Sequence, residues 1–286
     1  MMRKPKFTPP PGACDTHLHI YGPFDRFPLS SEKVYDIKRS ALLEDYVALM
    51  DQLGLERAVV VNGGGNGFNN SVTLDAISRM DGRIKGLALI KPDISDRELR
   101  ALHEGGMTGF RTRASGKAAP SLAEAAQIAP RVKDFGWHVE FHVRSIQDAI
   151  DALPHLQKLG LPYVLDHVAY IGAEIPLDSE QAKIVLRTLR DDPNCWVNLY
   201  SFYQRSHTGA PGYVDMIPVA RALVEAAPDR VIWGTNWPHV VIEVPEPDNV
   251  DLIDFMFAAL PDEDARNKVL AANPARLYGW PDATPA

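Results

Sequence analysis

Two short apolar segments of this sequence each carry two histidines that are an even number of positions apart. The first segment reads D-T-H-L-H and contains His17 and His19, and the second reads W-H-V-E-F-H-V and contains His138 and His142. Side chains two positions apart on a β-strand point to the same face. Two neighbouring imidazoles are costly to bury without a function, and imidazoles polarise carbonyls, move protons or bind metals. The pattern predicts that His17, His19 and His142 belong to an active site and that His138 is structural.

Cationic and polar side chains follow other apolar segments. Arg111 and Arg113 stand two apart in F-R-T-R and would also share one face of a strand. The candidates beyond later segments are His167, Tyr170, Arg205, Asn236 and His239. The planar guanidinium of arginine binds a carboxylate through two hydrogen bonds. Together these residue types predict a pocket for an anionic, oxygen-rich small molecule.

These candidates need a fold that brings the ends of many strands together. Short apolar segments at 13–20, 57–62, 84–90, 109–113, 137–143, 163–168, 195–200 and 230–235 alternate with helix-like stretches near 41–53, 70–80, 96–104, 121–135, 146–158, 179–191, 213–227 and 249–259. Eight strand–helix units are typical of a (β/α)8 TIM barrel, whose functional residues lie at the carboxyl ends of the strands. We expect a single α/β barrel domain over 1–286, with an extended, proline-rich lead-in over 1–12.

A doubly wound α/β sheet is the alternative fold for the same alternation. That fold usually carries G-x-G-x-x-G in its first strand–helix turn. The string N-G-G-G-N-G-F over 62–68 follows the second strand-like segment, and its third glycine is misplaced for that motif. The sequence therefore favours the barrel, with 62–68 as a mobile loop near its mouth rather than a phosphate-binding loop.

The composition excludes several classes of protein. The 286 residues include 30 lysines and arginines against 37 acidic residues, a net charge of -7, which argues against non-specific nucleic-acid binding. No run of 18 apolar residues is present, so we expect no membrane span. The two cysteines, Cys14 and Cys195, form neither a disulfide framework nor a zinc motif. We expect a cytoplasmic protein, and the sequence leaves its oligomeric state open.

The motifs also resemble a known family. D-T-H-L-H, the D-H at 166–167 and W-G-T-N-W-P-H at 233–239 are similar to motifs of the amidohydrolase superfamily, in its branch that contains 2-pyrone-4,6-dicarboxylate lactonase. The likeness runs nearly end to end, and includes G-F-R, G-W-H-V and the terminal N-P-A-R-L-Y. It implies a barrel that acts on lactones of dicarboxylic acids without a metal. The site residues that it implies are His17, His19, Tyr35, Arg111, His167 and His239.

This sequence departs from the family pattern at three positions. The family usually reads W-G-T-D-W-P-H, with the aspartate as general base for water, where this chain has Asn236. A second family arginine corresponds to Tyr170, and an aromatic position corresponds to His142. A neutral amide keeps hydrogen bonding but removes general-base catalysis, an effect of about 10²–10⁴-fold. Loss of this carboxylate also weakens any metal site, so we expect no metal and no other cofactor.

A hydroxyl of the substrate can replace water as the attacking group. Well-oriented intramolecular attack has an effective molarity of roughly 10⁵ M or more and needs less help from a base. The product is then a lactone of different ring size. Resemblance to the lactone-isomerising members of the branch implies conversion of D-galactaro-1,5-lactone to D-galactaro-1,4-lactone, in galacturonate breakdown.

Each candidate residue has an expected role in this ring exchange. The histidines that would polarise the C1 carbonyl are His17, His19 and His167. His239 or a neighbouring histidine would move the proton, and Asn236 would orient the substrate. Arg111, with Arg113 or Arg205, would hold the free carboxylate, beside Tyr35, His142 and Tyr170 as further substrate contacts.

Other functions remain open from the sequence. The first alternative is a metal-independent hydrolase of a dicarboxylic acid lactone such as 2-pyrone-4,6-dicarboxylate. The others are a metal-dependent decarboxylase and a binding protein that kept the pocket but lost the base. An engineered aspartate-to-asparagine change at Asn236 in an ordinary lactonase would also give this sequence.

Overall fold

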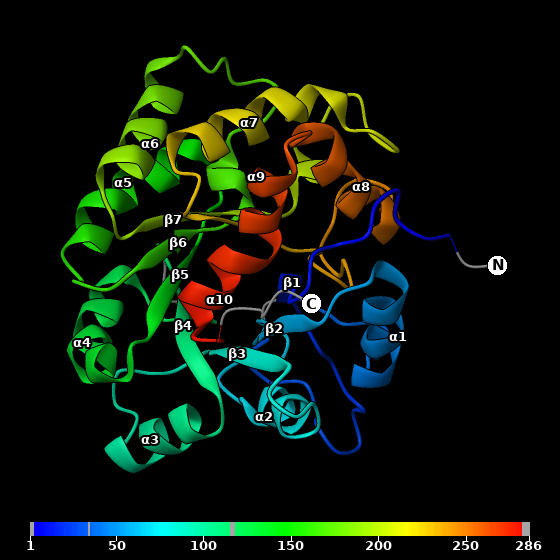
Figure 1. The fold of residues 1–286 in the computed structure, drawn as a ribbon. Coiled ribbons are helices and arrows are strands. Elements are labelled where there is room, and N and C mark those ends of the chain that lie inside the picture. Colours follow the sequence, from blue (N-terminus) through cyan, green and yellow to red (C-terminus); the bar gives the residue numbers. More distant parts are fainter. Residues whose placement is uncertain (1–2, 34, 115–117, 282–286) are drawn as a thin grey trace.

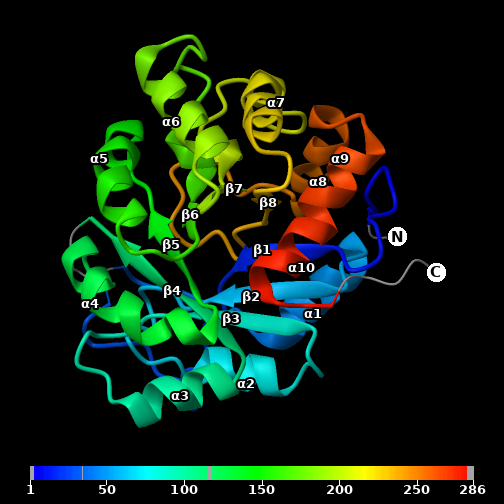
Figure 2. The ribbon, with the colours of Figure 1, turned by 60° about the vertical axis from the view of Figure 1, so that its left-hand side comes forward.

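Eight parallel strands form a barrel in chain order (Figures 1 and 2). The structure, a computed structural model, describes residues 3–33, 35–114 and 118–281, so the first two residues of the expected lead-in lie outside it. The strands are β1 (Cys14–Leu18), β2 (Arg57–Val61), β3 (Ile84–Ala88), β4 (Met107–Arg113), β5 (His138–His142), β6 (Tyr163–Leu165), β7 (Cys195–Leu199) and β8 (Val231–Trp233). The predicted α/β barrel is confirmed, and each strand coincides with a predicted segment.

A helix follows each strand and covers the outside of the barrel (Figure 2). These helices are α1 (Leu43–Leu53), α2 (Ser71–Ser78), α3 (Asp96–Glu104), α4 (Leu122–Val132), α5 (Ile146–Gln157), α6 (Glu180–Asp191), α7 (Ile217–Ala226) and α8 (Asn249–Ala259). Their ends are set by local chemistry: Ser121, for example, accepts a hydrogen bond from the backbone N–H of Glu124, whose carboxylate accepts one from the Ser121 N–H.

A further helical segment, which the sequence analysis did not predict, follows α8. It comprises α9 (Glu263–Asn267), a π-helical turn (Lys268–Ala272) and α10 (Asn273–Tyr278). Leu277 and Tyr278 of α10 pack among inward-facing barrel residues such as Val59 and Val164. The Tyr278 ring also meets the ring of His138, at the start of β5, at a centroid distance of 5.0 Å. Helix α10 therefore closes the end of the barrel at which the strands begin, opposite their carboxyl ends.

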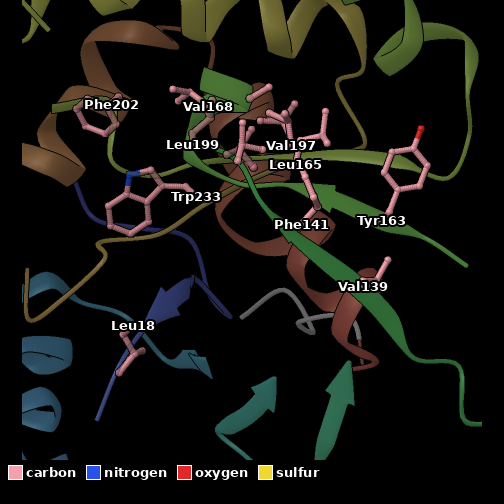
Figure 3. Packing of buried hydrophobic residues seen from close by; sticks show 14 of the residues in the cluster. Leu18, Val139, Phe141, Tyr163, Leu165, Val168, Val197, Leu199, Phe202 and Trp233 are labelled. Atoms are coloured by element: carbon pink, nitrogen blue, oxygen red, sulfur yellow. The ribbon is translucent and has the colours of Figure 1, made fainter. Parts of the chain in front are cut away.

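Alternation along the strands separates the core from the site. Val139 and Phe141 of β5 point outward into the main apolar core between strands and helices (Figure 3). His138, Glu140 and His142 occupy the alternate positions of the same strand. Polar side chains thus enter the barrel interior without interrupting the apolar layer that supports it.

The barrel closes between β8 and β1 through side-chain and loop contacts. The buried Asp15 carboxylate accepts hydrogen bonds from the backbone N–H of Thr235 (2.9 Å) and from its hydroxyl (2.5 Å). The Asn236 N–H donates to the His17 carbonyl at 2.8 Å, and the N–H of His19 donates to the Trp237 carbonyl at 2.8 Å. These contacts hold the two histidines of β1 beside the segment that carries Asn236. No helix in the described residues has the length and apolar character needed to cross a membrane.

Candidate active site

A cavity of about 360 Å³ opens at the carboxyl ends of the strands. Its size suits a small organic ligand. The predicted site residues that line it are His17, His19, Tyr35, Arg111, Arg113, His142, His167, Tyr170, Arg205 and Asn236. Gly64 also lines it, so the 62–68 loop lies at the mouth as predicted, whereas its mobility stays a prediction. A larger cavity of about 590 Å³ beside Lys91 and Glu124 has neither histidine nor arginine in its lining, so the chemistry belongs to the smaller one.

A buried ionic cluster forms one wall of this cavity. The β4–β5 register places Arg111 beside Glu140, whose carboxylate accepts from the Arg111 Nε–H at 2.7 Å. The Nη2 group of Arg111 donates to Asp166 at 2.7 Å and to the Tyr200 hydroxyl at 3.1 Å. The Tyr200 hydroxyl in turn donates to Asp166 at 2.6 Å. Breaking such a buried pair typically costs about 3–5 kcal/mol, which makes the cluster a rigid support.

The hydrogen bonds of Arg111 define what it can still do. Within the described residues, all of them use Nε and Nη2. Burial alone would lower the pKa of this guanidinium, but the adjoining tyrosine and carboxylates raise it well above its usual value. Arg111 is therefore a permanent cation whose charge is offset by two buried carboxylates, and its Nη1 makes no hydrogen bond within the described residues. Sequence reasoning missed Glu140, Asp166 and Tyr200, although each lies at or next to a predicted strand end.

The hydrogen-bond partners of the two β1 histidines favour a proton on Nδ1 of each ring. The Nδ1 atom of His19 lies 2.7 Å from the Val61 carbonyl oxygen, which can only accept, so Nδ1 carries the proton. The Nδ1 atom of His17 lies 3.3 Å from the Glu140 carboxylate. Burial lowers the pKa of both imidazoles well below the usual value, so both are neutral at pH 7. A neutral imidazole protonated at Nδ1 offers a lone pair at Nε2. The geometry thus favours proton acceptance over the carbonyl polarisation expected from the sequence.

His142 lies between a donor and an acceptor. Its Nδ1 atom is 3.3 Å from Nη2 of Arg111 and 3.2 Å from Oδ2 of Asp166. Either tautomer of His142 therefore finds a partner. Its ring meets that of His167 edge-on at 5.0 Å. Both rings have pKa values that burial lowers, so this part of the wall is uncharged at neutral pH.

An unusual backbone turn presents His167 and Tyr170 to the cavity. All four residues of the 3-10 turn His167–Tyr170 have positive φ, between 49° and 59°. Non-glycine residues avoid this left-handed region, at a cost of roughly 1 kcal/mol or more each. Spacing in the sequence carries no signal for such a turn. Strain of this kind clusters at binding and catalytic sites, and here it places two predicted site residues in the lining of the cavity.

Arginines outnumber carboxylates at the rim of the cavity, where Glu243 is the one acidic residue in the described lining. Arg113 and Arg205 line it, and the Arg205 guanidinium lies 4.4 Å from the centroid of the Tyr170 ring, which it covers. Arg144 also lines the rim, where it pairs with Asp148. These guanidinium groups favour a ligand carboxylate at the mouth. On the opposite side, the Tyr35 hydroxyl is 2.9 Å from that of Tyr21.

Asn236 and His239 differ in their access to the cavity. The Nδ2 group of Asn236 donates to the Ser201 Oγ and the Tyr203 hydroxyl, each at 3.1 Å, which leaves its amide oxygen for the cavity. His239 does not line the cavity: its Nδ1 contacts the Tyr203 hydroxyl at 2.9 Å and its Nε2 contacts Oδ1 of Asn249 at 3.0 Å. Burial lowers the pKa of His239 to about 4. The structure places His239 behind Asn236, and Tyr203, which the sequence analysis did not single out as a site residue, links the two.

The donor set was tested for a fit to a metal ion. Among the described residues, His142, Asp166 and His167 offer ligand atoms within 4.8 Å of one another. However, Oδ2 of Asp166 already accepts from the Arg111 guanidinium and the Tyr200 hydroxyl. A divalent cation there would displace or face a fixed positive charge. These residues therefore do not fit a metal ion, and no step below is assigned to one.

Comparison with known proteins places the chain in a family. A family model for the amidohydrolases matches residues 14–280. A 2-pyrone-4,6-dicarboxylate hydrolase of Comamonas testosteroni is 34% identical over 98% of this chain and 93% of its own length. A D-galactarolactone isomerase of Agrobacterium fabrum is 29% identical over 94% and 91%. A crystal structure of an apo protein from Agrobacterium tumefaciens is 28% identical, with a TM-score of 0.87 over 97% of this chain and 99% of that one. The barrel and its strand-end site are those of an amidohydrolase-type enzyme. The chain belongs to the amidohydrolase family, as its motifs indicated.

Proposed function

We propose that this enzyme converts D-galactaro-1,5-lactone to D-galactaro-1,4-lactone by intramolecular acyl transfer. The observation that carries the proposal is Asn236, in the segment after β8 (Val231–Trp233): it lines the cavity, and its amide nitrogen donates to two hydroxyl oxygens. An amide there orients a substrate but does not take a proton from water. Attack by a hydroxyl of the substrate itself suits such a site better than attack by water.

The cavity offers a group for each part of this reaction. Nη1 of Arg111 can stabilise the oxyanion that forms when the 4-hydroxyl attacks C1. Arg113 and Arg205 line the rim of the cavity, where their guanidinium groups suit the free carboxylate of the lactone. The amide oxygen of Asn236 accepts from a substrate hydroxyl. Fixing both ends of the lactone in this way supplies the orientation that intramolecular attack requires.

A lactone hydrolase is the second candidate, and the comparisons favour it on one count. The hydrolase of Comamonas testosteroni is more similar to this chain, at 34% identity, than the isomerase of Agrobacterium fabrum, at 29%. Both names describe proteins that act on lactones, which supports a lactone of a dicarboxylic acid as the substrate under either function. The choice between the two depends on whether water or a substrate hydroxyl attacks the carbonyl.

The decisive experiment follows both products in labelled water. Purified enzyme is mixed with D-galactaro-1,5-lactone in H₂¹⁸O, and products are followed by NMR and mass spectrometry. The proposal expects the 1,4-lactone to form without ¹⁸O. Uptake of label into an open-chain acid at the rate of turnover would instead establish the hydrolase, and tight binding without turnover would establish a binding protein.

A substitution at Asn236 tests the same reasoning from the enzyme's side. N236D restores a carboxylate at the end of β8, so we expect hydrolysis of the lactone to rise relative to ring exchange. The matched control is N69D, because Asn69 is exposed and the change adds the same charge away from the cavity. An unchanged ratio of hydrolysis to isomerisation in N236D would contradict the role given to Asn236.

A further inference from the structure

Glu140 divides its carboxylate between two partners inside the barrel. Its Oε1 accepts from the Arg111 Nε–H at 2.7 Å, and its Oε2 lies 3.3 Å from Nδ1 of His17. The side chains of Glu140 and His17 have no solvent exposure. Arginine only donates, so Oε1 is committed to Arg111, and Oε2 is available to accept the Nδ1 proton of His17.

The remaining contacts of His17 hold its ring in one position. The ring stacks on that of Tyr200, with centroids 3.8 Å apart and planes 17° from parallel. The His17 N–H donates to Asp15 at 3.0 Å, and its carbonyl accepts from the Asn236 N–H at 2.8 Å. Its Nε2 is buried and has no hydrogen-bond partner in the described part of the chain, while the residue lines the cavity. A fixed, unpaired lone pair in a cavity is suited to accept a proton from a bound ligand.

We propose that Glu140 is a positioning residue that keeps the proton of His17 on Nδ1, so that Nε2 of His17 is the base of the ring exchange. As the 4-hydroxyl oxygen bonds to C1, its proton moves to Nε2. The C1–O5 bond then breaks and the same proton passes from Nε2 to O5, so no proton or electron pair is gained or lost overall. The Glu140 carboxylate stabilises the transient imidazolium, as a buried carboxylate does in other carboxylate–histidine pairs.

This pair accounts for a catalytic base without a carboxylate on β8. The proton acceptor comes from β1 and its support from β5, across the barrel, while Asn236 remains a neutral contact. The inference rests on the proposed function for the identity of the attacking hydroxyl. The proton position on His17, however, exists without substrate and can be measured by itself.

The first test is the tautomer of His17 in the whole protein. Two-bond proton–nitrogen NMR spectra of ¹⁵N-histidine-labelled enzyme distinguish Nδ1–H from Nε2–H, and H17Q assigns the signals by their loss. The proposal expects His17 to be neutral at pH 7 with its proton on Nδ1. A proton on Nε2, or an imidazolium, in the unsubstituted enzyme would overturn it, whatever the behaviour of any variant.

The substitution E140Q should reverse this tautomer. The new side-chain amide has one oxygen, which accepts from the cationic Arg111. Its N–H₂ group then faces Nδ1 of His17, which must accept, so the imidazole proton of His17 moves to Nε2. His19 is an internal control, because its Nδ1 proton is held by the Val61 carbonyl and should not move. An E140Q protein that folds and leaves the His17 tautomer unchanged would contradict the role of Glu140.

Kinetics separate positioning from a merely structural effect. We expect E140Q and H17Q each to lower kcat by about 10²–10⁴-fold, with a much smaller change in KM. The double variant should be no slower than the slower single variant, because both act through one atom. Fully multiplicative losses would show that Glu140 does not act through His17. If ¹⁸O from labelled water enters the product while His17 carries its proton on Nδ1, the proposed isomerisation is wrong. The role of Glu140 and His17 is then retained, with Nε2 of His17 accepting a proton from water.

Discussion

Asp15 joins the first strand of the barrel, β1, to the segment after the last strand, β8. Its removal should lower the free energy of unfolding by an amount that follows from its hydrogen bonds. The fully buried carboxylate accepts from two backbone N–H groups, those of His17 (3.0 Å) and Thr235 (2.9 Å). It also accepts from the hydroxyls of Tyr46 (3.0 Å) and Thr235 (2.5 Å). The backbone groups can only donate, whereas the hydroxyls can also accept.

These differences predict opposite outcomes for two substitutions. D15A leaves two buried N–H groups without an acceptor, at roughly 1–3 kcal/mol each, so we expect a loss of about 2–6 kcal/mol in the free energy of unfolding. D15N retains an oxygen for both N–H groups and places its amide nitrogen against the two hydroxyls, which can turn to accept. We therefore expect D15N to lie within about 1 kcal/mol of the unsubstituted protein at pH 7.

Urea unfolding followed by circular dichroism and tryptophan fluorescence measures these losses. The matched control is D45A, which removes an exposed carboxylate that accepts one hydrogen bond within the described residues, from the Leu42 N–H, for a loss of about 1 kcal/mol. The reasoning is refuted if D15N is as unstable as D15A, since the partners would then require charge rather than an acceptor. It is equally refuted if D15A costs no more than D45A.

Three further outcomes follow from the same contacts. Burial raises the pKa of Asp15 to about 6, above about 3.9 in an unfolded chain, so the stability that its proton gives the folded protein is full below pH 4 and is lost as pH rises through 6. Between pH 4 and pH 7 the free energy of unfolding of the unsubstituted protein should therefore fall by about 3 kcal/mol relative to that of D15N. R205M removes a rim cation and should raise KM about 10- to 100-fold with a smaller change in kcat, whereas the exposed R187M should change neither, as steady-state kinetics would show. Dialysis against EDTA should leave turnover unchanged, because Oδ2 of Asp166 already accepts from Arg111 and Tyr200. Loss of activity that added zinc or manganese restores would show that His142, Asp166 and His167 do hold a metal ion.

The barrel could be predicted because its periodicity is local. Each strand lies in a short, largely apolar segment, and most outer helices are amphipathic, although α8 buries most of its residues, so counting the segments sufficed. The segment Glu263–Tyr278 was missed because it lies outside the strand–helix repeat. Its last helix packs Leu277 and Tyr278 into the interior, a tertiary contact that no periodicity in the sequence signals. The same counting brought most candidates into one cavity, since alternate residues at strand ends converge in this fold.

The parts of the site that sequence could not predict depend on backbone turns and pairing across the barrel. Asn236 and His239 both have positive φ, and the turn that they form places the His239 imidazole behind the cavity wall, against Tyr203. The carboxylates that pair with Arg111 come from β5 and the end of β6. One-dimensional spacing does not reveal which of many acidic residues face a given arginine. Their alternation with predicted site residues was the signal available, as in H-V-E-F-H for Glu140.

The distribution of charge also bears on why the residue at 236 is neutral. Glu140 and Asp166 already place two carboxylates behind one guanidinium at the base of the cavity, while Arg113 and Arg205 lie at its rim. The free carboxylate of the proposed lactone would therefore be most favourable beside the rim arginines, which leaves Arg111 for the oxyanion that forms at C1. A third carboxylate at 236 would oppose the entry of the substrate's reactive end. An amide there lets the lactone ring approach Nε2 of His17, and the single orientation that results is what an intramolecular attack needs.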